Sequence, residues 1–201
     1  MICSSIGDKT LIEEYKIVRN FISKEECNSL VERLDEFYNN GYTIPPDNQC
    51  PNSPTFYGIF NDESKKWLPR IEELTGKELY PTYTYSRIYQ KGEILLPHID
   101  RWECEYSFTL ALKYDKEIWP FYVQTSQGVV EAMLDNGDML MYKGVENLHW
   151  RMRLENDFHY QAFFHYVDKN GPHADKKYDG RYDFATTQDA TEEIVRRSNV
   201  L

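Results

Sequence analysis

The chain has 201 residues, a length that suits one catalytic domain with a single buried core. It carries 33 acidic and 23 basic residues, and the net charge of −10 disfavours a phosphate-binding surface, so nucleic acid is not an expected partner. No run of about 18 apolar residues could cross a bilayer, and residues 1–9 lack the apolar core of a secretory signal. We therefore expect a soluble, cytoplasmic protein with no membrane partner. Its four cysteines lie far apart, which favours reduced thiols.

The N-terminal part predicts a strand followed by a helix. Residues 10–21 are typical of an entry strand. Ser23 and Glu26 have the S-x-x-E spacing of a capping box, in which each side chain satisfies a backbone donor at a helix start. Apolar residues then recur at three- and four-residue steps, and the polar stretch that ends at Gly41 stops the helix.

A long loop and a second helix come next. Residues 42–57 are rich in Pro, Asn and Asp and predict an irregular loop of the kind that often covers a functional site. The second helix is expected from about Asp62 to a stop at Gly76. At the other end of the chain, residues 169–185 are polar and irregular, and residues 187–199 predict a short charged helix.

From Tyr80 onward the pattern changes to that of β-strands. Alternating residues and turn signals predict eight strands, over residues 81–90, 94–98, 107–114, 119–124, 128–134, 139–143, 149–154 and 160–167. The expected fold is mainly β with flanking helices, in the form of a double-stranded β-helix, also called a cupin-like jelly roll. Residues 1–201 would then form one domain, with a helical part at about 10–79, a jelly-roll core at about 80–168 and a tail at 169–201.

Three residues in this region form a candidate metal site. His98 and Asp100 are two apart on a strand, so their side chains point to the same side. His149 stands at the head of a late strand, which a jelly roll brings beside an early one. Two imidazoles and one carboxylate on one side of a metal make the facial triad of non-haem Fe(II) oxygenases, which leaves positions free for a 2-oxo acid and O₂.

The segments around these residues resemble the prolyl 4-hydroxylase-like family of Fe(II)/2-oxoglutarate dioxygenases, over about residues 15–167. The strand and capped helix at the start are similar to the family's entry segment. The stretch Arg87-Ile-Tyr-Gln-Lys-Gly-Glu-Ile-Leu-Leu-Pro-His-Ile-Asp100 is similar to its pattern of a tyrosine, a glycine and H-x-D. The resemblance implies Fe(II), 2-oxoglutarate and O₂ as cofactor and co-substrates, and implies that Tyr89 contacts the 2-oxoglutarate. It leaves open whether ascorbate assists.

One position departs from the family's pattern. The family has a Lys or Arg about ten residues after the distal histidine, where it pairs with the far carboxylate of 2-oxoglutarate, and this chain has His159 there. Another cation would have to replace it. Arg151 is the first candidate because it lies two residues after His149. Lys113 is the second, because on the strand after the H-x-D pair it is expected to share a face with Thr109 and Ala111, and Arg87 is the third. For each of the three residues, a solvated position or a structural ion pair remains an alternative role.

The substrate is less well defined. Arg101, Trp102 and Trp150 are candidates for the rim of a substrate entrance. The resemblance implies hydroxylation of a C–H bond with release of succinate and CO₂, on a prolyl residue of a protein or peptide, or on a small molecule. Two other functions fit the same residues: a zinc-dependent hydrolase, since Zn(II) also accepts two histidines and a carboxylate, and a non-catalytic jelly-roll binding module.

Overall fold

A computed structural model describes residues 14–181 and 186–198. The beginning of the expected entry strand, residues 10–13, and Cys3 lie outside the described residues. Among the residues described, no helix has the length and apolar character needed to span a lipid bilayer.

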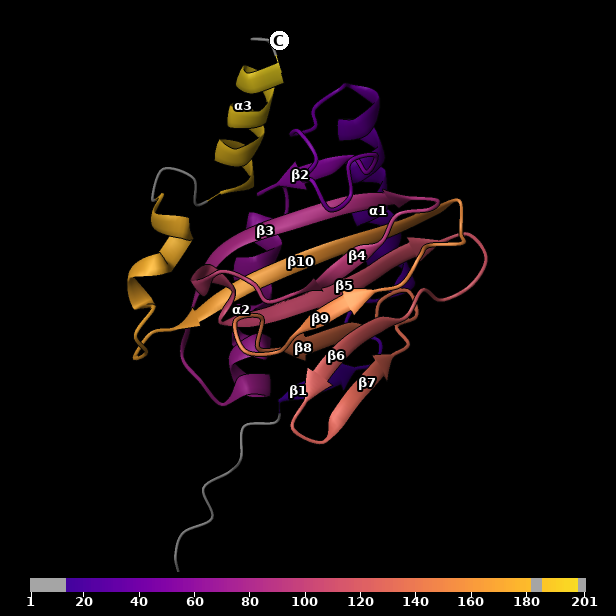
Figure 1. Ribbon diagram of the computed structural model, residues 1–201. Helices are drawn as coiled ribbons and strands as arrows, with labels where there is room; N and C mark the ends of the chain where they lie inside the picture. Colours follow the sequence, from indigo (N-terminus) through magenta and orange to yellow (C-terminus); the bar gives the residue numbers. More distant parts are fainter. Residues whose placement is uncertain (1–13, 182–185, 199–201) are drawn as a thin grey trace, which may run out of the picture.

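Two antiparallel sheets form the body of the structure (Figure 1). The larger sheet has the order β1-β8-β5-β10-β3-β2 and the smaller one the order β4-β9-β6-β7. Their strands are β1 (Tyr15–Val18), β2 (Thr55–Tyr57), β3 (Leu79–Gln90), β4 (Leu95–His98), β5 (Tyr106–Tyr114), β6 (Phe121–Thr125), β7 (Gly128–Ala132), β8 (Met139–Tyr142), β9 (His149–Arg151) and β10 (Phe158–Asp168). This is the double-stranded β-helix, or jelly roll, that the strand pattern predicts.

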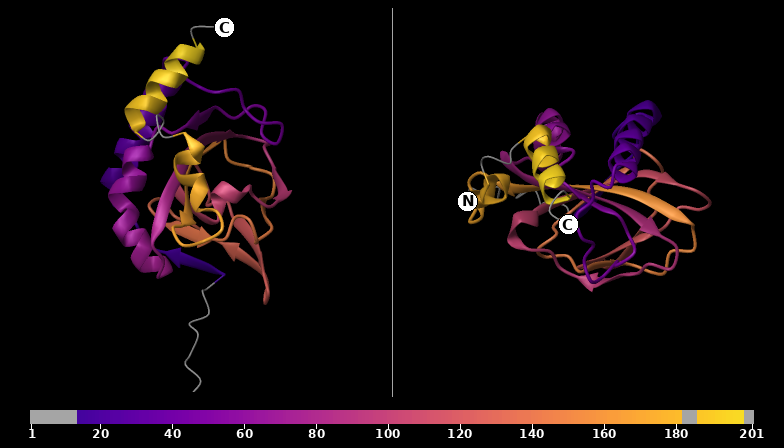
Figure 2. Two further views of the ribbon diagram at one scale, coloured as in Figure 1. Left: turned by 90° about the vertical axis from the view of Figure 1, so that its left-hand side faces the viewer. Right: turned by 90° about the horizontal axis from the view of Figure 1, so that it is seen from above.

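The helices cover one face of the larger sheet. Seen from above, α1 (Lys24–Asn39) and α2 (Asn61–Thr75) lie on the same side of the sheets (Figure 2, right). The capping box is confirmed, because Ser23 Oγ accepts from Glu26 N at 3.1 Å while Glu26 Oε2 accepts from Ser23 N at 3.0 Å. Gly76 ends α2 in the left-handed conformation (φ 65°), which glycine adopts at little cost. Beyond β10 come a 3-10 segment (Ala174–Gly180) and α3 (Thr187–Ser198).

The two faces of the larger sheet have different roles. Its outer face packs on the helices, with residues such as Leu34, Ile71 and Phe164 fully buried between them. Its inner face packs on the smaller sheet around Tyr89, Phe121 and other mostly apolar side chains. Because the inner face is also lined by polar residues of β3 and β10, the space between the sheets can hold both a core and a site.

The structure differs from the sequence interpretation at two places. Residues 42–57 are not wholly irregular, since their end forms β2, which pairs with β3. The interpretation that Lys113 shares a face with Thr109 and Ala111 was wrong. A β-bulge shifts the register so that Lys113 lies opposite Tyr160, on the helix-covered side. Lys113 Nζ lies 5.4 Å from the centre of the Tyr160 ring.

Candidate metal site and adjoining cavity

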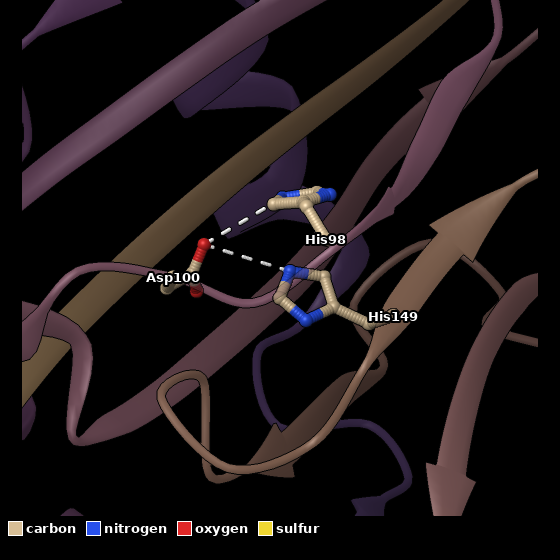
Figure 3. A group of neighbouring side chains, drawn as sticks. All are labelled: His98, Asp100 and His149. Carbon is tan, nitrogen blue, oxygen red and sulfur yellow. Dashed lines mark ion pairs between the residues drawn. The ribbon is translucent and has the colours of Figure 1, made fainter.

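Strand pairing brings the three predicted metal ligands together. His98 at the end of β4 lies directly opposite His149 at the start of β9, so the two imidazoles share a face and their ring centres are 4.2 Å apart. Asp100 follows β4 and turns toward both of them (Figure 3). Its Oδ1 lies 3.6 Å from Nε2 of His98 and 3.6 Å from Nε2 of His149. One candidate ligand atom from each of the three residues lies within 4.8 Å of the others.

The outer atoms of these side chains are held by neighbours. Nδ1 of His98 is 2.7 Å from the Leu96 carbonyl, and Nδ1 of His149 is 2.9 Å from the Asn147 carbonyl. Since a carbonyl can only accept, both Nδ1 atoms carry the proton and both Nε2 atoms present a lone pair to the centre. Asp100 Oδ2 accepts from Ser107 Oγ at 3.3 Å, which leaves Oδ1 facing the two Nε2 atoms. The donor set therefore fits a divalent metal ion.

The protonation states also suit metal binding. Burial, followed by the charge of His149, lowers the pKa of His98, which favours the neutral imidazole that a metal requires. Burial would raise the pKa of Asp100, but the hydrogen bond with His149 and the surrounding imidazoles outweigh it, so the net shift is downward. The Asp100 carboxylate is thus kept ionised beside the two imidazoles.

A glycine is required at position 144 because the backbone there passes very close to Asp100 and its neighbours. Its carbonyl accepts from the Asp100 backbone N at 2.8 Å. A Cβ at this position would overlap Asp100 Oδ2, Ser107 Oγ and the Cys104 carbonyl. No side chain other than hydrogen can therefore stand here without moving Asp100.

A cavity of about 450 Å³ adjoins the triad. Its walls come from β3, from the triad segment and from the loop between α1 and β2, with Tyr89, Arg87 and Arg101 among the predicted residues that line it. Trp102 does not line the cavity: it is exposed and stacks on His173 with ring centres 4.6 Å apart. Trp150 points away from His149 and stacks on Tyr122. Of the rim candidates, only Arg101 reaches the cavity wall.

Arg151 lies behind this wall and is fully buried. Its Nη1 donates to the Trp119 carbonyl and its Nη2 donates to Gln161 Oε1 at 3.0 Å. Within the described parts of the chain, no carboxylate forms an ion pair with it, and its Nε has no hydrogen-bond partner. Burial lowers the pKa of this guanidinium to about 10. Burying a cation without an ion-pair partner costs free energy, and a bound anion would offset that cost.

Arg151 is linked to two residues of β10, to Gln161 directly and to His159 through Gln161. His159 stands where the family's cation is expected, and its Nε2 donates to Gln161 Oε1 at 2.6 Å, while Gln161 Nε2 donates to Thr109 Oγ1 at 2.6 Å. Gln161 thus links His159 to the guanidinium of Arg151. Sequence reasoning missed Gln161, although its place two residues after His159 on one strand already put both on the same face.

Sequence reasoning also missed the residues that support Asp100. Ser107 Oγ contacts Nδ1 of His165 at 3.0 Å, so Ser107 links Asp100 to a second buried imidazole. Asp100, Cys104 and His165 form another group of potential ligands, but this group shares Asp100 with the first. Neither Ser107 nor Cys104 has a sequence signal that distinguishes it from ordinary strand residues.

Comparisons with known proteins identify the fold. No protein-family model matches the sequence, and no curated protein matches it significantly. Several solved structures are similar in fold. A Pseudomonas putida prolyl-4-hydroxylase matches with a TM-score of 0.63 and 10% identity, over 77% of this chain and 92% of that one. HygX from Streptomyces hygroscopicus, with nickel, 2-oxoglutarate and hygromycin B bound, matches with a TM-score of 0.63 and 12% identity, over 78% and 84%.

A third similar structure is a prolyl hydroxylase from Trichoplax adhaerens in complex with a hypoxia inducible factor peptide fragment. It has a TM-score of 0.62 and 13% identity, and the match covers 78% of this chain and 84% of that one. The chain therefore has the fold of the prolyl 4-hydroxylase-like 2-oxoglutarate/Fe(II) oxygenases, at a sequence identity of 10–13% to these three structures.

The close approach at Gly144 gives a first testable prediction. Gly144→Ala should displace the Asp100 carboxylate and lower the affinity for Fe(II) or Ni(II) by roughly tenfold or more, as expected for loss of a well-placed support of a ligand. Anaerobic titration calorimetry measures the affinity, and circular dichroism checks that the variant is folded. An unchanged metal affinity in folded Gly144→Ala would contradict the assigned position of Asp100.

The buried histidines give a second prediction, on acid stability. Burial lowers the pKa of His159 to about 3 and that of His165 to about 4, against about 6.5 in an unfolded chain. Below pH 6.5 the unfolded state binds protons that the folded state does not, so each histidine should reduce the free energy of unfolding as pH falls toward 4. The expected slope is about 1.4 kcal/mol per pH unit for each group.

Urea unfolding of the metal-free protein between pH 6.5 and 4 measures this slope. His159→Gln should lower the slope of the free energy of unfolding against pH by the contribution of one histidine. Equal slopes in the wild type and in His159→Gln would contradict a neutral, buried His159.

Proposed function

We propose that the protein is an Fe(II)- and 2-oxoglutarate-dependent dioxygenase that hydroxylates a C–H bond. The observation that carries this proposal is the convergence of His98, Asp100 and His149 with both Nδ1 atoms held by backbone carbonyls. Bound Fe(II) would supply the O₂ chemistry that couples substrate hydroxylation to the conversion of 2-oxoglutarate into succinate and CO₂. The three side chains would hold the ion, and the adjoining cavity would provide room for both substrates.

We propose that Arg151 and Tyr89 hold the 2-oxoglutarate. Tyr89 lines the cavity between the sheets, and Arg151 lies next to it with a guanidinium that no carboxylate compensates. A carboxylate of 2-oxoglutarate would supply the missing negative charge through charge-assisted hydrogen bonds. The other two candidates are less suitable, because Lys113 lies on the outer face and Arg87 already pairs with Asp47.

The substrate and the location in the cell complete the proposal. A prolyl residue of a protein or peptide is the leading substrate by resemblance. The solved structures with this fold include a complex with a peptide and one with hygromycin B, so a small molecule remains the second choice. We place the protein in the cytoplasm, which agrees with the free, buried state of Cys27, Cys50 and Cys104.

The metal and co-substrate can be tested together. Fe(II) and 2-oxoglutarate added without oxygen should produce a visible metal-to-ligand charge-transfer band, and admission of air should then yield succinate. His149→Ala should lose both signals because it removes a ligand, and His173→Ala, at a position away from the cavity, should keep both. Well-folded, metal-loaded protein that shows neither signal would overturn the oxygenase proposal. Oxygen-independent hydrolysis by the zinc form would favour the hydrolase.

The assignment of Arg151 has a separate test. Arg151→Gln should raise the KM for 2-oxoglutarate by roughly 10- to 100-fold. A hydrogen bond to a charged group contributes about 1.5–3 kcal/mol, which corresponds to that change in affinity. Arg151→Lys should lose less because it keeps the charge, and Lys113→Gln should leave KM unchanged. Succinate formation at varied 2-oxoglutarate concentrations measures these values. An unaltered KM in Arg151→Gln would show that another cation holds the co-substrate.

A further inference from the structure

Arg87 is a second buried arginine at the cavity, and its surroundings differ from those of Arg151. It stands on β3, is 1% exposed and lines the cavity wall together with His98. Its guanidinium carbon lies 5.3 Å from the centre of the Tyr85 ring and 5.2 Å from that of Tyr89. The aromatic rings and the β3 backbone thus fix a cation in the wall that surrounds the metal site.

The carboxylate that compensates Arg87 comes from the loop between α1 and β2. Nη2 of Arg87 donates to Oδ2 of Asp47 and to the Tyr85 hydroxyl. The other Asp47 oxygen accepts from the backbone N of Gln49 at 3.0 Å and of Cys50 at 3.1 Å, so Asp47 also orders the turn it belongs to. Its side chain is 50% exposed, although its partner is buried. The ion pair therefore joins a buried cation to a half-exposed carboxylate.

The loop around Asp47 has few other attachments. In the right panel of Figure 2 the segment runs from the helical layer across the end of the two sheets. Residues 45–48 are exposed, and among the hydrogen bonds of the described residues only the Asp47–Arg87 pair ties residues 45–49 to the strands. Ile44, Pro45, Asp47 and Gln49 line the cavity. Movement of this short stretch would uncover Arg87 without breaking a β-ladder bond.

The other arginines at the site are arranged differently. Arg101 is 47% exposed in its side chain and pairs with Asp179 at 2.7 Å and with Glu103 at 3.5 Å, so losing one carboxylate would leave it another. Arg151 has no carboxylate and suits the co-substrate. Arg87 has one carboxylate, which is half-exposed and can leave, and replacement by another anion would avoid the cost of leaving this guanidinium uncompensated.

We propose that Arg87 is a specificity-determining residue that binds a carboxylate of the primary substrate, and that Asp47 occupies this position until the substrate arrives. This inference rests on the proposed function, because it assigns the second substrate of the same site. The exchange of one carboxylate for another keeps the charge of the cavity unchanged. It selects acids over their neutral esters and amides, since a neutral group would leave the buried guanidinium uncompensated.

The test uses the whole 201-residue chain, with acetate as the probe. Asp47→Ala removes the internal carboxylate, so acetate should raise its melting temperature by about 4 °C at a tenfold excess over the dissociation constant. In acetate, the melting temperatures of the wild type and of the double variant Asp47→Ala/Arg87→Gln should rise by less than a third of that amount. The melting temperature of Asp47→Ala should also rise by less than a third of it when acetate is replaced by acetamide or by sodium chloride of equal ionic strength. Asp179→Ala is the matched control. It should show no larger acetate shift than the wild type, because Arg101 still has its ion pair with Glu103.

The outcomes separate this inference from the proposed function, since the melting experiment needs neither iron nor turnover. An acetate shift that is no larger in Asp47→Ala than in wild type or the double variant would overturn the inference. In a second measurement, Arg87→Gln should keep its affinity for 2-oxoglutarate within twofold, read from the charge-transfer band. If that affinity falls more than tenfold, Arg87 holds the co-substrate and the inference is wrong.

Discussion

The cross-strand pair of His98 and His149 is the constraint on which the rest of the site depends. Opposed residues of antiparallel strands have side chains on one face at short separation, so the β4–β9 register alone sets the distance between the two imidazoles. Asp100 then needs only one turn of chain to reach both. The Gly144 carbonyl holds the Asp100 backbone at 2.8 Å, and the missing side chain of Gly144 leaves room for its carboxylate. The site is thus positioned by an edge strand and its neighbour in the smaller sheet.

Charge compensation would allow one cavity to distinguish the two acids that we propose as its ligands. Two arginines are buried at the site. Each attracts an anion more strongly than it would in water, because the electrostatic interaction between opposite charges is stronger in a buried environment. Arg151 has no carboxylate among the described residues, whereas Arg87 has Asp47. A permanently uncompensated cation suits a co-substrate that is used in every cycle. A cation with an internal carboxylate suits a ligand that must displace something before it binds.

Local features were the ones that the sequence could predict. The capping box at Ser23, the glycine stop at Gly76 and the shared face of His98 and Asp100 all depend on residues within a few positions of one another. Pairing between distant segments could not be read in the same way. The bulge that turns Lys113 to the outer face depends on how β5 meets β10. The support of Asp100 by Ser107 depends on how the irregular chain between them folds back, which no periodic pattern predicts. The C-terminal helix and most strands were predicted within a few residues, because their periodicity is local.

The most direct measurement of the central claim is anomalous diffraction from a crystal soaked in Ni(II) or grown anaerobically with Fe(II). One ion should lie within bonding distance of Nε2 of His98, Nε2 of His149 and an oxygen of Asp100, with its remaining positions facing the cavity. An ion bound instead through Asp100, Cys104 and His165, or no ion near the paired imidazoles in metal-loaded crystals, would contradict it.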